Sequence, residues 1–225
     1  MTQLVYVFDL DDTLISEREY ACSGFRAVGN FVQQEYDVIG FEELAVSFFN
    51  QGLRGHIFNE VLNNLGLKIT EDFVAKLVDV YRNHLPDIGL LVDARKCLDL
   101  LKAKKIPMAL ITDGYAVSQR KKIASINLSK WIDLIIVTDE LGSTSWKPSP
   151  DAYLKVMQCF QGVAERFIYV GDNPLKDFVT PKKMGWQTAR VLRTKSEHAN
   201  TVPPTPDHAP GIEVRSLTEL IQSVQ

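Results

Sequence analysis

The stretch LVYVFDLDDT, residues 4–13, joins a short apolar run to a group of acids. The run Leu4–Phe8 is rich in branched and aromatic residues, which is typical of a buried strand in a parallel sheet. Asp9, Asp11 and Asp12 follow it at once. Because ligands of open α/β sheets bind beyond the carboxyl ends of the strands, we expect these acids to line a binding site.

Further apolar runs predict more strands of the same sheet, and helical patterns separate most of them. Strands that alternate with helices are typical of a parallel α/β sheet with right-handed crossovers. The expected strands are Leu4–Phe8, Pro107–Thr112, Leu134–Thr138, Arg166–Val170, Thr188–Leu192 and a weaker Ile212–Val214.

The helices between these strands are expected to bury one apolar face each, at the i, i+3, i+4, i+7 spacing. One helix has a clear start, because Ser149 can cap it and Pro150 suits its first turn. The buried faces would consist of Ala94, Cys97, Leu98 and Leu101 in one helix and of Tyr153, Val156, Met157 and Phe160 in the other.

The first two strands are separated by about a hundred residues that read mostly as helix. We interpret residues 16–90 as an inserted helical cap domain, and residues 1–15 and 91–225 as the α/β core. Glycines punctuate the insert, and its expected helices are Glu17–Glu35, Glu42–Asn50, Arg54–Asn64 and Thr70–His84. After it come a helix over Asp93–Lys104, a mobile surface loop over residues 196–211 and a closing helix over Ser216–Val224.

Composition sets limits on the partners. The net charge of -3 gives no long-range attraction to nucleic acid or to an anionic membrane. Three cysteines at wide spacings form neither a disulfide framework nor a zinc motif. No signal peptide or membrane-spanning run is recognisable, so we expect a cytoplasmic protein.

Three acids crowded at one strand end are unfavourable without a cation, because like charges oppose one another's ionisation. A hard divalent ion such as Mg²⁺ accepts oxygen ligands and keeps substrate phosphate oxygens in its shell. Asp9 and Asp11 are two residues apart and point the same way from an extended segment. One could attack phosphorus while the other transfers protons. A solvated acidic turn stays an alternative, whereas a calcium loop would require a glycine where Leu14 and Ile15 stand.

Two further motifs follow other strands. The hydroxyl of Thr112 and the N–H groups of the turn at Asp113 and Gly114 could hold phosphate oxygens, although Thr-Asp-Gly is also an ordinary turn. Lys147, before the Ser149 cap, could neutralise charge that develops on a phosphoryl group. A solvated surface lysine is the alternative at this position.

The last motif follows the Arg166–Val170 strand. Asp172 ends that strand, and Asp177 falls in the first turn of the next expected helix. Asp172 could cap that helix, and Asp177 could simply favour the positive end of the helix dipole. Each later motif is modest alone, but acids, a hydroxyl, a lysine and acids again all occur at strand ends, in this order.

This arrangement resembles the haloacid dehalogenase-like hydrolase superfamily, and most of all its phosphatases with a helical cap. The resemblance covers nearly the whole chain, and it rests on DLDDT at residues 9–13, on Thr112, on Lys147 with Pro148, and on Gly171-Asp172 with Asp177. It implies a Rossmann-like parallel sheet with the cap inserted soon after the first strand.

The resemblance also implies a mechanism. Asp9 would attack phosphorus to form an aspartyl-phosphate, and Asp11 would serve as general acid and then as general base. Thr112 and Lys147 would hold the phosphoryl oxygens. Mg²⁺ would bind the carboxylates of Asp9 and Asp172 and the backbone carbonyl of Asp11, and Asp177 would support Lys147 or the metal from behind.

The substrate is expected to be a small phosphorylated metabolite, such as a sugar phosphate or a nucleotide. Arg18, Arg54 and His56 of the insert could contact its leaving group, although solvated side chains are an equal alternative. We expect a monomer or a homodimer that binds neither nucleic acid nor membrane.

Other functions remain open. A phosphotransferase or mutase would share the aspartyl-phosphate step, and a phosphate-binding module without turnover would keep the fold. A 2-haloacid dehalogenase is disfavoured, because the dehalogenating members of the superfamily lack the second acid, here Asp11.

Overall fold

The computed structural model describes residues 3–223. The chain divides into two compact units, of which one is the segment Arg18–Ile88 and the other is the chain up to Glu17 and from Gly89 onward. Within residues 3–223, no helix combines the length and the apolar character that a membrane span requires.

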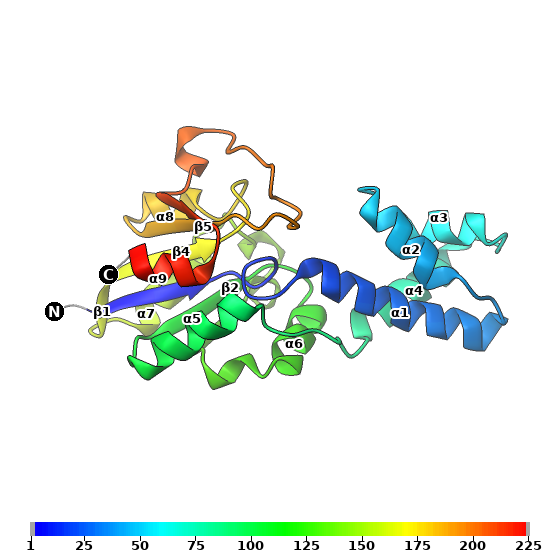
Figure 1. Ribbon diagram of the computed structural model, residues 1–225, viewed down its shortest axis with the longest axis horizontal. Coiled ribbons are helices and arrows are strands. Elements are labelled where there is room, and N and C mark those ends of the chain that lie inside the picture. Colours follow the sequence, from blue (N-terminus) through cyan, green and yellow to red (C-terminus); the bar gives the residue numbers. More distant parts are fainter. Residues whose placement is uncertain (1–2, 224–225) are drawn as a thin grey trace. The chain divides into compact units, whose positions relative to one another are not determined.

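The larger unit is built on one parallel sheet (Figure 1). In the described residues its strands lie in the order β3-β2-β1-β4-β5-β6, with β1 paired to both β2 and β4. The chain winds from β1 towards β3 and then returns to the other side of β1, so the winding reverses between β1 and β4. Ligands of doubly wound sheets bind at such a reversal. The strands are β1 (Gln3–Phe8), β2 (Met108–Thr112), β3 (Leu134–Val137), β4 (Ala164–Gly171), β5 (Gln187–Val191) and β6 (Ile212–Val214).

Helices cover both faces of this sheet, with α5 and α9 on one side and α7 on the other (Figure 1). Successive residues of a strand face opposite sides. Val5 and Val7 accordingly pack in one apolar cluster with Tyr153 of α7. The helices of this unit are α5 (Val92–Ala103), α6 (Ala116–Ser125), α7 (Asp151–Cys159), α8 (Val179–Lys183) and α9 (Leu217–Ser223), and Val224, the end expected for the last one, lies outside the described residues.

The smaller unit is helical. Its apolar core includes Phe25, Val28 and Val32 of α1, together with Val61 and Leu77 from later helices. Because these residues recur along one face of each helix, packing of the helices against one another buries them. The helices are α1 (Glu17–Tyr36), whose first residue belongs to the larger unit, α2 (Phe41–Asn50), α3 (Ile57–Asn64) and α4 (Glu71–Asn83).

The parallel α/β sheet expected from the sequence is confirmed, but several local predictions are wrong. Helix α7 begins at Asp151 after Pro150, and no side chain caps it. Ser149 instead belongs to the preceding turn, where its N–H bonds the Trp146 carbonyl. Met157, expected in the buried face of α7, is 38% exposed.

Two helix starts are also later than expected. Helix α3 begins at Ile57 rather than at Arg54, because Gly55 has a left-handed backbone (φ 77°) that interrupts the segment. Helix α8 begins at Val179, so Asp177 precedes the helix instead of lying in its first turn. The Asp177 carboxylate instead accepts hydrogen bonds from the Lys147 ammonium and from the N–H of Asn173.

Candidate active site

Asp9 stands at the carboxyl end of β1, in the middle of the sheet. Its N–H donates to the Val170 carbonyl over 2.8 Å, which ties it to β4. The chain then turns tightly, because the N–H groups of Leu14 and Ile15 both bond the Leu10 carbonyl. This turn lets Asp9 and Asp11 face the end of the sheet while the chain leaves towards α1.

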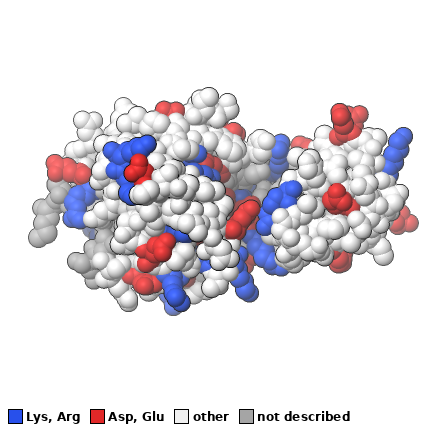
Figure 2. All heavy atoms as spheres, turned by 90° about the horizontal axis from the view of Figure 1, so that it is seen from above, with Lys and Arg blue, Asp and Glu red and all other residues white. Residues whose placement is uncertain are grey.

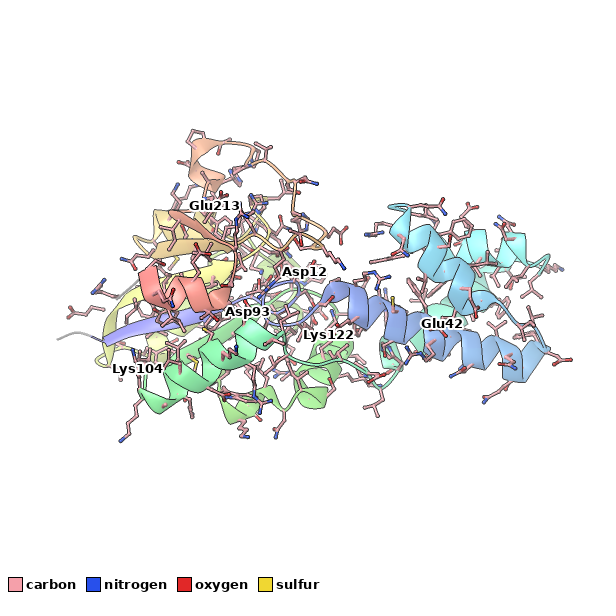
Figure 3. All side chains as sticks on the ribbon, in the orientation of Figure 1. Asp12, Glu42, Asp93, Lys104, Lys122 and Glu213 are labelled. Atoms are coloured by element: carbon pink, nitrogen blue, oxygen red, sulfur yellow. The ribbon has the colours of Figure 1, made fainter. Side chains whose placement is uncertain are left out.

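Asp12 holds this turn in place (Figure 3 labels it). Its backbone is left-handed (φ 50°), a conformation that aspartate tolerates better than most residues. Its carboxylate accepts bonds from the N–H of Glu17 and from the N–H of Glu197, each over 3.0 Å. Asp12 thus joins the loop after β1 to the start of the loop over residues 196–211.

The Lys147 ammonium lies behind Asp9 and is completely buried. It donates to Asp9 Oδ1 over 2.8 Å, to Asp177 Oδ1 over 2.8 Å and to the Tyr169 hydroxyl over 2.9 Å. Burial opposes the charge, but the carboxylates of Asp177 and Asp9 outweigh it, so the pKa of Lys147 lies well above its ordinary value. Lys147 is therefore a fixed positive charge beside Asp9.

Asp113 organises the neighbouring loops. Its Oδ1 accepts bonds from the Thr138 hydroxyl (2.8 Å) and from the Lys147 N–H (3.0 Å), and its Oδ2 pairs with the Lys176 ammonium (2.8 Å). Both oxygens are thus engaged within the protein. Any hydrogen bond that the turn at Asp113 and Gly114 gives to a phosphate would come from the backbone.

Asp9, Asp172 and Asp177 each offer a carboxylate oxygen to one small region, with these atoms within 4.8 Å of one another. Asp172 Oδ2 is buried and has no hydrogen-bond partner. Burial, followed by the carboxylates of Asp177 and Asp9, raises the pKa of Asp172 to about 9. Burial likewise raises the pKa of Asp9 to about 6, against the opposing effect of Lys147.

The carboxylates of Asp9, Asp172 and Asp177 are all buried, and the Lys147 ammonium beside them balances only one negative charge. The cluster therefore has an excess of carboxylates. A cation with oxygen ligands would remove that excess and would give the orphaned Asp172 oxygen a partner. The donor set therefore fits a hard divalent ion. Gly171 keeps this cluster compact, because a Cβ at that position would overlap the Asp177 carboxylate.

Asp11 has a separate set of partners from helix α6. Lys122 Nζ donates to its Oδ1 over 2.8 Å, and Gln119 Nε2 donates to its Oδ2 over 2.9 Å. Gln119 also donates to the Thr112 hydroxyl oxygen over 3.1 Å. Burial alone would raise the pKa of Asp11, but the charge of Lys122 and the hydrogen bonds from Gln119 and Lys122 bring it below its ordinary value.

A hollow of about 140 Å³ opens at this end of the sheet. Of the site residues predicted from the sequence, Asp9, Asp11, Asp113 and Asp172 line it. Thr112, Lys147 and Asp177 are buried. Lys147 bonds Asp9 of the lining, and Asp177 accepts the N–H of Asn173, which also lines the hollow. Thr112 is joined to the lining through Gln119, which donates both to Thr112 and to Asp11. The other lining residues are Asp12, Glu17, Asn173, Lys176, Glu197 and His198.

The three residues suggested for the leaving group lie in the smaller unit, and none lines this hollow. Arg18 donates to Asn50 Oδ1 over 3.4 Å. The Arg54 guanidinium stacks on the Phe49 ring, 3.8 Å from its centroid, and donates to the Phe49 carbonyl. His56 directly precedes α3 and is exposed.

Sequence reasoning missed several members of the site. Lys122 and Gln119 lie on a helix whose apolar pattern is weak, and Lys176 looked like one of many surface lysines. Glu197 and His198 belong to the loop over residues 196–211, which was expected to be mobile. That loop is held by Arg190, which donates to the carbonyls of His198 (2.6 Å) and Thr201 (2.9 Å).

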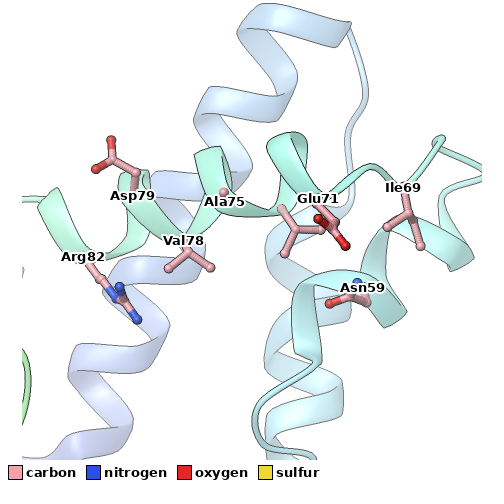
Figure 4. Close-up of a pocket in the computed structure, with 8 residues that line it drawn as sticks. Asn59, Ile69, Glu71, Ala75, Val78, Asp79 and Arg82 are labelled. Carbon is pink, nitrogen blue, oxygen red and sulfur yellow. The ribbon is translucent and has the colours of Figure 1, made fainter.

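A larger hollow, of about 570 Å³, lies in the smaller unit (Figure 4). It runs along α4, where Val74, Ala75 and Val78 form much of its wall. Its lining has no group of facing carboxylates and no buried cation. Charged groups are interspersed over the face seen in Figure 2, without one continuous basic surface. Chemistry, and not size, therefore identifies the hollow at Asp9 as the candidate active site.

Comparison with known proteins agrees with this fold. A glyceraldehyde 3-phosphate phosphatase of Methanocaldococcus jannaschii is 26% identical, over 97% of this chain and 96% of that protein. A phosphoglycolate phosphatase of Aquifex aeolicus is 27% identical, over 84% of each chain. Among solved structures, a HAD family hydrolase of Deinococcus radiodurans superposes with a TM-score of 0.67 at 17% identity, covering 98% of this chain and 94% of that one.

The sequence profile of one family extends over most of the chain. The profile described as haloacid dehalogenase-like hydrolase matches residues 6–191, a range that includes the second half of β1, the strands β2 to β5, and Asp9, Asp11, Asp113, Asp172 and Asp177. This chain belongs to the haloacid dehalogenase-like hydrolase family.

Proposed function

We propose that this protein is a magnesium-dependent phosphatase that hydrolyses a small phosphate monoester by way of a phosphorylated Asp9. The observation that carries the proposal is the buried group at the ends of β1 and β4. There Asp9 is bound to Lys147, and Asp172 presents a carboxylate oxygen without a partner. A nucleophile, a fixed positive charge and a cation site are the components that phosphoryl transfer requires.

In the first step an oxygen of Asp9 attacks phosphorus, and the bond between phosphorus and the ester oxygen breaks. Asp11 gives its proton to that oxygen, so the leaving group departs as a neutral alcohol. Lys147, Thr112 and the backbone N–H groups at Gly114 hold the phosphoryl oxygens. Proton transfer of this kind contributes roughly 10²- to 10⁴-fold in rate.

In the second step the oxygen of a water molecule attacks phosphorus, and Asp11 takes a proton from that water. The bond between phosphorus and the Asp9 oxygen then breaks, which releases inorganic phosphate and restores the Asp9 carboxylate. Asp11 thereby regains the proton that it gave to the leaving group in the first step. This covalent route divides one difficult displacement into two.

The proposed metal site uses the carboxylates of Asp9 and Asp172 and the backbone carbonyl of Asp11, with Asp177 as a supporting residue. Mg²⁺ at that place would neutralise charge on the phosphate. The excess of buried carboxylates supports this assignment, as does the raised pKa of Asp172.

We infer the substrate class from the relatives. The relatives above are named for phosphates of two- and three-carbon compounds. We therefore propose a small sugar phosphate or a similar metabolite, and we propose the unit Arg18–Ile88 as the cap that selects it.

A panel of phosphorylated metabolites tests the proposal. The purified protein is incubated with each compound, with Mg²⁺ or with a chelator, and released phosphate is measured. Phosphoglycolate, glyceraldehyde 3-phosphate and nucleoside monophosphates belong in the panel. We expect Mg²⁺-dependent release from at least one of them. Transfer of phosphate to a second metabolite instead of to water would indicate a phosphotransferase or mutase, and halide release from a 2-haloacid without metal would contradict the proposal.

A further inference from the structure

Two polar side chains of helix α6 hold the carboxylate of Asp11. Gln119 and Lys122 are three residues apart, so they share one face of the helix, and both are buried. Lys122 Nζ bonds Asp11 Oδ1 over 2.8 Å, and Gln119 Nε2 bonds Asp11 Oδ2 over 2.9 Å. Each oxygen therefore has its own donor, which fixes both the position and the rotation of the carboxylate.

Lys122 is itself held on its other side. Its ammonium pairs with Glu17 Oε2 over 2.9 Å, while its side chain is only 5% exposed. A buried ammonium between two carboxylates cannot move far without leaving a charge unpaired. Lys122, on α6 in Figure 3, is thus a rigid support for Asp11.

Gln119 connects the Asp11 carboxylate to residues 112–114, the segment that holds the phosphoryl oxygens in the proposed function. Its Nε2 also lies 3.1 Å from the Thr112 hydroxyl oxygen and donates to the Asp113 carbonyl. Gly114 allows this approach, because a Cβ there would come within 2.9 Å of Gln119 Nε2, and the backbone at Gly114 is left-handed (φ 127°). The position of Asp11 is therefore coupled to that of Thr112.

We propose that Lys122, together with Gln119, is a positioning residue that aims Asp11 at the ester oxygen for proton transfer. This inference rests on the proposed phosphatase function, in which Asp11 is the acid that protonates the leaving group. Lys122 does not touch the substrate in this account and acts only through Asp11. A purely structural ion pair would support the fold without any preference among leaving groups.

Two esters with different leaving groups distinguish a positioning role of Lys122 from a purely structural one. A nitrophenolate departs without a proton, whereas an alkoxide requires one. The value of kcat/KM covers the steps up to departure of the leaving group and excludes the later attack of water. We expect Lys122→Met to lower kcat/KM for the best alkyl phosphate of the panel by on the order of 10²-fold, and for 4-nitrophenyl phosphate by only roughly a few-fold.

Three further variants serve as controls. Lys155→Met makes the same substitution at an exposed lysine on α7 and should leave both kcat/KM values unchanged. Lys122→Arg keeps the charge and should restore part of the activity on the alkyl ester. Should Lys122→Met fail to fold because Glu17 is left unpaired, the double variant Lys122→Met/Glu17→Gln removes that charge and should show the same loss of preference for the alkyl ester.

Equal losses of kcat/KM for both esters, or no loss for either, would overturn the inference and leave Lys122 as a structural residue. Wild-type protein that hydrolyses neither ester and no other compound of the panel would instead contradict the proposed function, and the inference would fall with it. The wild-type rates thus separate failure of the function from failure of the positioning role.

Discussion

At the scale of single residues, the site depends on how buried charges are balanced. Lys147 contacts two carboxylates, and removal of one partner from a buried ion pair typically costs about 3–5 kcal/mol. Asp177 is completely buried and also accepts the N–H of Asn173 over 3.0 Å. Its position therefore sets that of Lys147, and through Lys147 the environment of Asp9.

Gly171→Ala tests this dependence. The added methyl group would overlap the Asp177 carboxylate, so Asp177 and with it Lys147 must shift. We expect kcat/KM to fall by roughly 10²-fold, the effect typical of a misplacement of about 1 Å, and the melting temperature to fall as well. Steady-state kinetics and thermal denaturation measure the two effects.

Gly89→Ala is the matched control for this substitution. An added Cβ at Gly89 would meet no atom within 4 Å, and its backbone is not left-handed. Its kinetics should equal those of the wild type. Wild-type kinetics in Gly171→Ala would show that the position of Asp177 does not matter.

The sequence could indicate some of these residues and not others, for a physical reason. Asp9 and Asp172 directly follow apolar strands, and topology alone brings such positions to one edge of a sheet. Gln119 and Lys122 reach Asp11 from more than a hundred positions away in the chain. That contact depends on how α6 packs, and no local pattern reports it.

At the scale of helices and strands, apolar periodicity predicted where elements lie, and polar contacts decided where they end. Thr70 caps α4 by accepting the N–H of Phe73 over 3.2 Å. Ser149 also carries a hydroxyl and precedes a proline, but no side chain caps helix α7. The N–H of Ser149 instead bonds the Trp146 carbonyl in the turn at residues 146–149. A serine before an apolar run is therefore a weaker signal than the cap bond itself.

Two alanine substitutions compare these positions. We expect Thr70→Ala to lower the free energy of unfolding by about 1 kcal/mol, because a helix N–H loses its partner. We expect Ser149→Ala to change it by less than about 0.5 kcal/mol. Urea unfolding followed by circular dichroism measures both. A loss at Ser149 as large as that at Thr70 would contradict the assigned start of α7.

At the scale of the whole molecule, the order of the strands explains why the chemistry gathers in one place. β1 and β4 are neighbours in the sheet but about 160 residues apart in the chain, and the metal candidates follow these two strands. The parallel sheet was predictable because β1, β2 and β4 each contain a continuous apolar run, and helical patterns separate most of these runs in the chain.

The dependence of stability on pH and on Mg²⁺ follows from this buried cluster. The pKa of Asp172 is raised to about 9, whereas a carboxyl of an unfolded chain titrates near 3.9. Between about pH 4 and pH 9, the metal-free folded protein holds a proton that the unfolded chain releases. Stability from this group is thus greatest below about pH 4 and is lost as the pH rises towards 9.

Because Mg²⁺ competes with that proton, the stabilisation by Mg²⁺ should grow with pH across the same window. Melting temperatures with Mg²⁺ and with a chelator measure it, at about 2–4 °C for each kcal/mol in a protein of this size. We expect a larger difference near pH 8 than near pH 5.5, and none in Asp172→Asn. A difference that is equal at the two pH values, or that persists in Asp172→Asn, would contradict the proposed metal site.

The central claim is that Asp9 forms a covalent bond to phosphorus, and turnover by Asp9→Asn tests it most directly. Asparagine keeps the shape of the side chain and an oxygen that can accept from Lys147, and Asp177 still pairs with Lys147, so the variant should fold. With the best substrate of the panel and saturating Mg²⁺, the account predicts that kcat falls by at least roughly 10³-fold. A folded Asp9→Asn protein that releases phosphate at the wild-type rate would contradict the account.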